Sequence, residues 1–169
     1  MLRLTKKADY SLIALKHLAL RQQQTGQAVS AKEVADRCGI PSPILSKLLG
    51  KLGKSGFLLS EYGTNGGYRL AKDPRFISVL EVIRAIDGPI VLADCFTGDA
   101  HCGHSGRCTV KRPLRKIHEG ILRLLQGVSI QDMLQDNEEE AAHRPLSTPL
   151  VALQASSTTP YESVSAIGK

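Results

Sequence analysis

The sequence predicts a mainly α-helical chain with a small β-hairpin, arranged as a winged helix-turn-helix followed by a long helix suited to dimerisation. Two short helices meet at a tight turn around Gly39, which is typical of a helix-turn-helix. A glycine-rich hairpin follows them directly, as a wing would. Further on, residues 112–127 carry apolar side chains at heptad spacing, which favours pairing with another helix.

Length and composition indicate one globular unit with appended elements. The 169 residues are 42% hydrophobic, and no apolar run approaches the roughly 18 residues that a membrane-spanning helix needs. Residues 1–7 lack the apolar centre of a signal peptide, so we expect a cytoplasmic protein with no membrane partner. In that compartment thiols stay reduced, and clustered cysteines indicate metal or redox chemistry before disulfides.

The positive charge is concentrated in the N-terminal half. Residues 1–75 hold 13 Lys and Arg against 5 Asp and Glu, whereas residues 136–169 hold 2 against 5. A polyanion is therefore the expected partner of the first half. On charge alone, a basic surface that meets only solvent is the alternative.

Capping residues mark the first two helices. Residues 8–21 are apolar around most of the helix, which is typical of a buried helix. Ser30 followed by Glu33 has the spacing of a capping box and predicts the start of the second helix. Gly39 ends that helix, and Cys38, on its apolar side, is expected to be an inert core thiol.

Residues 43–55 form the expected DNA-recognition helix. Ser42 is the expected N-cap, and Pro43 suits the first helical position. The residues expected to point inward are Ile44, Leu45, Leu48, Leu49 and Leu52. The residues expected to reach bases or phosphates are Ser42, Ser46, Lys47, Lys51 and Lys54.

Two short strands, residues 57–60 and 68–70, flank a hairpin tip at residues 63–67. Glycines there let the backbone approach phosphates, to which its N–H groups can donate. The predicted DNA contacts of this wing are Thr64, Asn65, Gly66 and Arg69. Helix-turn-helix geometry also occurs in proteins that bind no DNA, but this order of basic helix and hairpin favours a double-stranded DNA operator as the partner.

The second half begins with a helix at residues 78–87, opened by a capping box of Ser78 and Glu81. An irregular loop at 93–109 and the long helix follow, and a short last helix spans residues 129–135.

These elements divide the chain into three parts. Residues 1–75 form the DNA-binding domain, and residues 76–135 hold the cysteine loop and the dimerisation helix. Residues 136–169 are acidic and then rich in Ser, Thr and Pro, so we expect a disordered tail.

Three cysteines share the irregular loop: Cys95, Cys102 and Cys108, with six and five residues between them. Converging thiolates repel one another unless a cation offsets their charge, so we expect a metal centre. Zinc sites usually pair cysteines two to four residues apart, and this wider spacing favours an iron–sulfur cluster, either [2Fe–2S] or [4Fe–4S]. A zinc-binding interaction module and a metal-free redox loop are the alternatives.

Three cysteines leave one position of a four-ligand site to fill. The residues that could supply the fourth ligand are Asp9, His17, His101, His104 and His118. Each of these histidines is also readily explained as an ordinary surface residue.

The long helix predicts a homodimer. Its apolar seam consists of Leu114, Ile117, Ile121, Leu124 and Val128, at steps of three and four residues. Packing of the seam onto its own domain is the alternative. Two-fold symmetry suits a helix-turn-helix protein because operators are usually palindromic.

The chain resembles the Rrf2 family of winged-helix regulators over about residues 1–135. The resemblance is carried by the start Leu2-Arg3-Leu4-Thr5-Lys6, the wing Gly63-Thr64-Asn65-Gly66-Gly67-Tyr68-Arg69-Leu70, the helix Ser78-Val79-Leu80-Glu81-Val82-Ile83, and the cysteine loop, in this order. Residues 87–90 and 127–130 look like the subgroup that regulates SUF-type iron–sulfur assembly operons. The wing arginine of the family is replaced here by Tyr62.

The resemblance implies a dimeric, DNA-binding repressor of iron–sulfur assembly genes, and not an enzyme. It implies that the three loop cysteines hold the cluster and that Asp9 of the opposite subunit completes it, as in nitric-oxide-sensing members. The histidine ligand of ISC-type members is replaced by Lys111. Nitric-oxide or redox sensing on the same fold is the alternative function.

Overall fold

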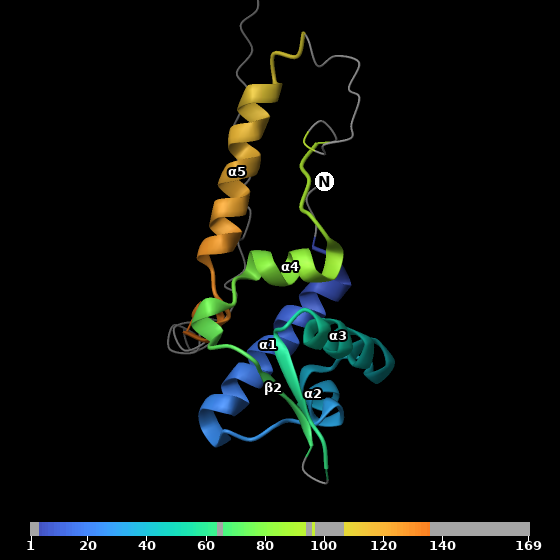
Figure 1. Ribbon diagram of the computed structural model, residues 1–169. Helices are drawn as coiled ribbons and strands as arrows, with labels where there is room; N and C mark the ends of the chain where they lie inside the picture. The colour runs from blue at the N-terminus through green and yellow to red at the C-terminus, as the bar shows by residue number, and fades with distance from the viewer. Residues whose placement is uncertain (1–3, 64–65, 94–95, 97–106, 136–169) are drawn as a thin grey trace, which may run out of the picture.

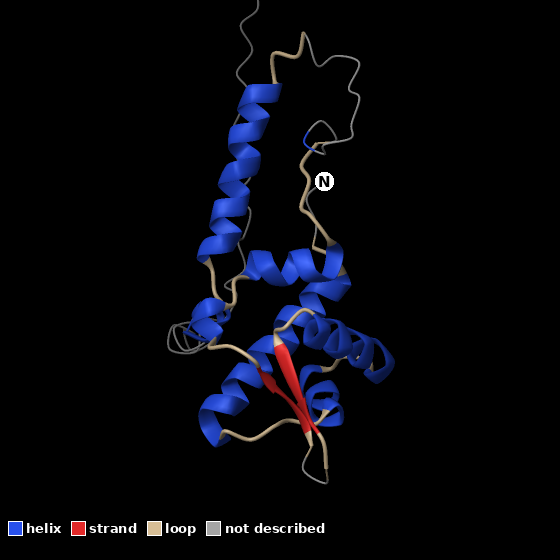
Figure 2. Cartoon of the chain, viewed as in Figure 1, coloured by secondary structure: helices blue, strands red, loops and turns tan. Residues whose placement is uncertain are grey.

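The computed structural model describes residues 4–63, 66–93, 96 and 107–135. The first half holds the helices α1 (Lys6–Thr25), α2 (Ala31–Cys38) and α3 (Ser42–Lys54), followed by the hairpin strands β1 (Leu58–Glu61) and β2 (Gly67–Leu70) (Figure 1). The 3-10 turn η1 (Pro74–Phe76) leads into the helices α4 (Val79–Asp87) and α5 (Lys111–Gly127). A last helical stretch spans residues 130–135. Helix dominates and the strands form a small antiparallel hairpin, which confirms the predicted fold class (Figure 2).

Hydroxyl caps start α1, α2 and α4. Thr5 Oγ accepts from the Ala8 N–H at the start of α1, which begins two residues earlier than predicted. Ser30 caps α2 through the Glu33 N–H. At α4 both halves of the predicted capping box form, because Ser78 accepts from the Glu81 N–H and the Glu81 carboxylate accepts from the Ser78 N–H.

The predicted cap of α3 is wrong. Ser42 lies inside the helix, and Pro41 occupies the N-cap position without a side-chain hydrogen bond. The Ser42 carbonyl instead accepts the hydroxyl of Ser46 at 2.9 Å. Pro43 removes one N–H that would have had no helical partner, and the Pro41 carbonyl accepts from the N–H groups of Ile44 and Leu45.

One apolar core joins the first half of the chain to the second. α1 runs through its centre and buries Leu15 and Leu18 almost completely. The same core takes in Ile83 of α4 and the fully buried Ile130 of the last helix. The boundary predicted at residue 75 therefore falls between elements that share one core, and the tail at 136–169 lies outside the described residues.

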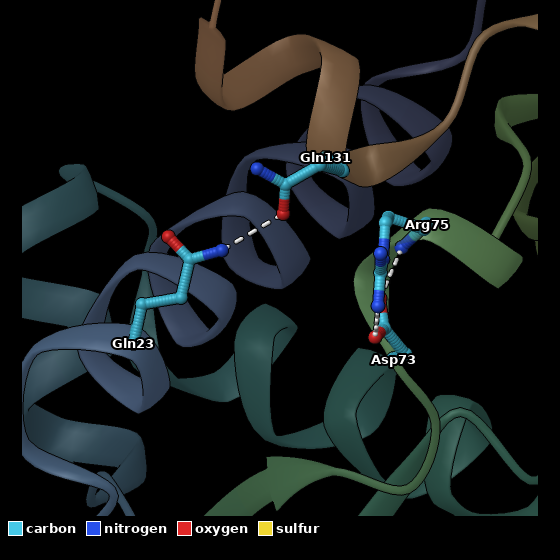
Figure 3. Close-up of polar contacts among 4 residues, drawn as sticks. All are labelled: Gln23, Asp73, Arg75 and Gln131. Carbon is cyan, nitrogen blue, oxygen red and sulfur yellow. Dashed lines mark hydrogen bonds and ion pairs between the residues drawn. The ribbon is translucent and has the colours of Figure 1, made fainter.

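The last helix is attached by polar contacts as well. The Gln23 amide donates to the Gln131 side-chain oxygen at 2.8 Å, which connects the end of α1 to this helix (Figure 3). Beside them, hydrogen bonds from the Arg75 side chain lower the pKa of Asp73 to about 2. Arg75 therefore has a partner within the chain.

α5 stands apart from this core. It rises away from α4 (Figure 1), and none of its residues is fully buried. Leu125, near its C-terminal end, is where it packs against the core. Within the described part of the chain, no helix has the length and apolar character needed to cross a membrane.

Candidate nucleic-acid interface and cluster site

The outer face of α3 carries the predicted recognition residues. Four leucines bury the inner face, Leu45, Leu48, Leu49 and Leu52. The opposite face exposes Ser42, Ser46, Lys47, Gly50 and Lys54. Ile44 was expected to point inward, but 41% of it is exposed, so that prediction is wrong. Its neighbour Leu45 is fully buried in the same turn, so Ile44 lies on the side of α3 that faces away from the core.

Lys51 is on the same helix but its ammonium group is engaged within the chain. Nζ donates to the backbone carbonyl of Ile86 in the last turn of α4 at 2.7 Å. This contact satisfies a carbonyl that has no partner within its own helix. Lys51 is therefore less available to a phosphate than Lys47 or Lys54.

The wing is a hairpin of two four-residue strands, paired from Leu58↔Leu70 to Glu61↔Gly67. The Arg69 guanidinium pairs with the Glu61 carboxylate at 2.5 Å, so an acid on the neighbouring strand partly offsets its charge. Thr64 and Asn65 lie outside the described residues. Tyr62, next to the tip in sequence, is 96% exposed.

The glycines of the wing have a packing role that the sequence did not reveal. A Cβ on Gly67 would collide with the backbone of Val29, and one on Gly66 would collide with the carbonyl of Glu61. The close approach at Gly67 allows a bridge in which Val29 and Tyr68 exchange two backbone hydrogen bonds, at 2.8 and 3.0 Å. This bridge attaches the wing to the chain segment that precedes α2.

The predicted cluster ligands are only partly within the described residues. Cys95 and Cys102 lie outside them, as do His101 and His104. Cys108 is a half-buried free thiol just before α5. No group of three metal-ligating side chains occurs among the described residues.

Two other candidate ligands, Asp9 and His118, lie on different helices, α1 and α5. Asp9 is half-buried in the first turn of α1, away from the start of α5 where Cys108 lies (Figure 1). His118 of α5 stacks on Phe96, with ring centroids 5.2 Å apart, and its buried Nδ1 has no hydrogen-bond partner in the described structure.

His17 and Cys38 belong to the packing of the helix-turn-helix. Burial lowers the pKa of His17, and nearby Arg21 and Arg37 act in the same direction while Glu33 opposes them. Burial also raises the pKa of the Cys38 thiol, which agrees with an inert core cysteine.

The predicted seam of α5 remains largely uncovered by the chain itself. Ile117 is 53% exposed, Leu124 73% and Val128 40%. Leu114 and Ile121 are half-buried. Ile121 lines a groove of about 330 Å³ between α5, the end of α4 and residues 88–92. An apolar stripe this exposed is unusual on a helix that meets only water.

Comparisons with known proteins agree with this architecture. A model of the Rrf2 family, described as iron-dependent transcriptional regulators, matches residues 4–136. The transcriptional regulator NsrR of Bacillus licheniformis is 35% identical over 138 residues, which cover 81% of this chain and 95% of that protein. IscR of Vibrio cholerae is 33% identical over 137 residues, 81% of this chain and 78% of that protein.

A solved structure of a named regulator has the same fold. IscR of T. potens superposes with a TM-score of 0.66 and 28% identity, covering 88% of this chain and 94% of that one. The family match confirms the resemblance carried by the wing, the α4 helix and the cysteine loop. The chain is therefore a member of the Rrf2 family and, as predicted, a DNA-binding transcription regulator rather than an enzyme.

Proposed function

We propose that the protein is a homodimeric repressor of iron–sulfur cluster assembly genes and senses cluster status through an iron–sulfur cluster of its own. The observation that carries the DNA-binding part of the proposal is the exposed face of α3, with Ser46, Lys47 and Lys54, beside the wing. In this arrangement α3 enters the major groove while the wing follows the phosphate backbone. A regulator of this kind acts on DNA in the cytoplasm.

The dimer is supported by the uncovered seam of α5. Pairing two seams would remove Ile117 and Leu124 from water, at about 25 cal/mol for each Å² of apolar area. The two recognition helices would then lie on one side of the duplex, at half-sites about one helical turn apart. A near-palindromic operator follows from this two-fold symmetry.

The cluster is supported by the chemistry of the donor set. The three cysteines lie on one connection between α4 and α5, and the half-buried thiol of Cys108 lies at its C-terminal end. Cys95, Cys102 and Cys108 would hold the cluster, which when bound supplies a redox-active, oxidant-sensitive group. NsrR and IscR, the relatives named above, and the iron dependence of the family model agree with this assignment.

Asp9 of the partner subunit is the proposed fourth ligand. Within one chain the first turn of α1 is separated from the start of α5, so a ligand on α1 is better supplied across the dimer than within it. A carboxylate binds soft iron more weakly than a thiolate does, and this position would therefore be the labile one. Release of Asp9 from the cluster would act directly on α1, the central helix of the DNA-binding half.

The test begins with protein purified without oxygen. We expect visible absorption with iron and sulfide in stoichiometric amounts, and binding to a duplex that weakens steeply as salt rises. Colourless protein containing zinc and indifferent to DNA would refute the proposal in favour of a zinc-binding interaction module. Loss of the spectrum with nitric oxide, but not on changing the iron supply, would favour the nitric-oxide-sensing alternative.

Single variants then assign the fourth ligand. Asp9→Ala should shorten the lifetime of the cluster spectrum, whereas the control Asp36→Ala, which removes an exposed carboxylate from α2, should not. An unchanged spectrum and lifetime in Asp9→Ala, with loss in His101→Ala or His104→Ala, would overturn the assignment to Asp9.

A further inference from the structure

A groove of about 490 Å³ lies beside the recognition helix, outside the contacts predicted from sequence. Its walls come from three elements, α1, α3 and the end of α4. Its cations are Lys6, Lys7, Lys47 and Lys51, and Ile44 and Tyr10 lie among its apolar lining residues. The groove therefore combines four lysines with an apolar floor.

Three of the four lysines of the groove, Lys6, Lys7 and Lys47, are available to an anion. The ion pairs among the described residues are Arg21–Glu33, Arg69–Glu61 and Arg75–Asp73, so none of the four lysines takes part in one. Lys6 and Lys7 are exposed at the start of α1, where the helix dipole adds positive potential. The Lys6 ammonium lies 5.9 Å from the centre of the Tyr10 ring. Lys51 alone is engaged, through the Ile86 carbonyl.

The floor explains an apolar residue that core packing leaves unexplained. Ile44 is 41% exposed on α3, although its neighbour Leu45 is fully buried. Tyr10 and Leu48 extend the same surface toward α1. A row of cations above an apolar floor is complementary to a sugar–phosphate backbone, because the deoxyribose ring is largely apolar and each phosphate carries a negative charge.

We propose that this groove binds the phosphate backbone of the same duplex whose major groove α3 enters. Ile44 and Lys47 belong both to α3 and to the groove, so the two surfaces are continuous. Lys6 and Lys7 then extend the DNA contact surface beyond the helix-turn-helix and the wing. The inference rests on the proposed DNA-binding function and adds a contact site on α1.

The test compares two charge-matched double variants of the full-length chain. Lys6→Gln with Lys7→Gln removes two cations from the groove. Arg112→Gln with Lys116→Gln removes two exposed cations from α5, far from the groove. Binding is followed by fluorescence anisotropy across a range of salt concentrations. The probes are a duplex selected by the wild-type protein from a randomised pool and a duplex of arbitrary sequence.

We expect the α1 double variant to lower the slope of log K against log salt by roughly one unit for each lost phosphate contact, about two in all. Affinity should fall by a similar factor for both duplexes, because backbone contacts carry no sequence information. The α5 double variant should keep the wild-type slope. An unchanged slope in the α1 variant, while wild-type protein binds, would overturn this inference and leave the proposed function intact. Wild-type protein that binds neither duplex would refute the proposed function itself.

A competing occupant of the groove is the acidic segment Glu138-Glu139-Glu140 of the chain itself. Changing these three residues to Gln should leave the effect of the Lys6 and Lys7 substitutions on DNA binding unchanged. If the α1 double variant instead binds DNA more tightly than wild type, and the Gln substitutions add no further gain to it, the groove binds the tail and not DNA, and the inference is wrong.

Discussion

The ammonium of Lys51 donates to the backbone carbonyl of Ile86 at 2.7 Å and thereby joins the recognition helix α3 to the last turn of α4. The next residue, Asp87, accepts the hydroxyl of Thr5 through both carboxylate oxygens, at 2.7 and 2.9 Å. Thr5 is the N-cap of α1. Three helices thus meet at the end of α4, from which the chain continues to the cysteine loop.

This contact gives Lys51 and Lys47 different expected roles. Lys51→Met should lower the free energy of unfolding by about 1 kcal/mol or more, because it removes a charged donor and leaves the Ile86 carbonyl without its partner. Lys47→Met should leave stability within about 0.5 kcal/mol of wild type and weaken DNA binding. Urea unfolding and salt-dependent binding of both variants separate the two effects. Equal loss of stability in the two would contradict the assignment.

Leu124 offers the sharpest test of the dimer seam. It is 73% exposed in the single chain, so Leu124→Asp should not disturb the fold of the monomer. An unpaired charge inside an apolar interface is costly, and the variant should sediment as a monomer and lose tight operator binding. Ile121→Asp is a poorer probe because Ile121 is half-buried against its own chain.

The matched control is Arg123→Asp, one residue earlier on the exposed surface of α5. It should remain dimeric. Sedimentation velocity decides the matter, and a Leu124→Asp variant that still sediments as a dimer would show that the seam packs elsewhere.

Gly67→Ala tests how the wing is attached. The added Cβ would meet the Val29 backbone, which belongs to the bridge with Tyr68 and cannot move freely. We expect a loss of stability of about 1 to 3 kcal/mol, as for other overpacked sites. Gly50→Ala is the control, since open space surrounds it within α3 and alanine favours helix there by up to about 1 kcal/mol. Thermal unfolding should move in opposite directions for the two variants.

Because the pKa of His17 is lowered in the folded chain, we expect the free energy of unfolding to fall at mildly acidic pH. Burial lowers its pKa in the folded chain below the ordinary value of 6.5. Below about pH 6.5 the unfolded chain therefore binds a proton more readily than the folded chain does, and stability decreases as pH falls. Glu33 opposes this shift without reversing it. In His17→Gln, chemical denaturation between about pH 7.5 and about pH 5.5 should show a shallower decrease than in wild type. An identical decrease would assign the pH dependence to other groups.

Much of the fold follows from local chemistry. Ser78 and Glu81 predict the start of α4, and Gly39 predicts the end of α2. The structure bears this out, because Gly39 ends α2 in the left-handed conformation, with a φ of 63°. These signals work because a hydroxyl cap or a left-handed glycine acts within a few residues of its position. The Ser42 prediction failed because two prolines surround it, and Pro41 takes the cap position.

The site was harder to predict because its contacts join residues distant in sequence. Lys51 looks like any other cation on the outer face of α3, and nothing local indicates that Ile86 lies within its reach. Lys6 and Lys7 approach Lys47 only through the packing of α1 against α3. The concentration of positive charge in residues 1–75 was the one feature that could have drawn attention to them.

The apolar stripe of α5 also bears on how steeply the regulator responds to its own abundance. If Ile117 and Leu124 are covered only by a second chain, a newly made chain must find a partner before both recognition helices can occupy one operator. At concentrations below the dissociation constant of the pair, the amount of dimer grows with the square of the amount of chain. Operator occupancy would then change about fourfold when expression changes twofold, so modest changes in synthesis or turnover would act as a threshold on the genes it controls.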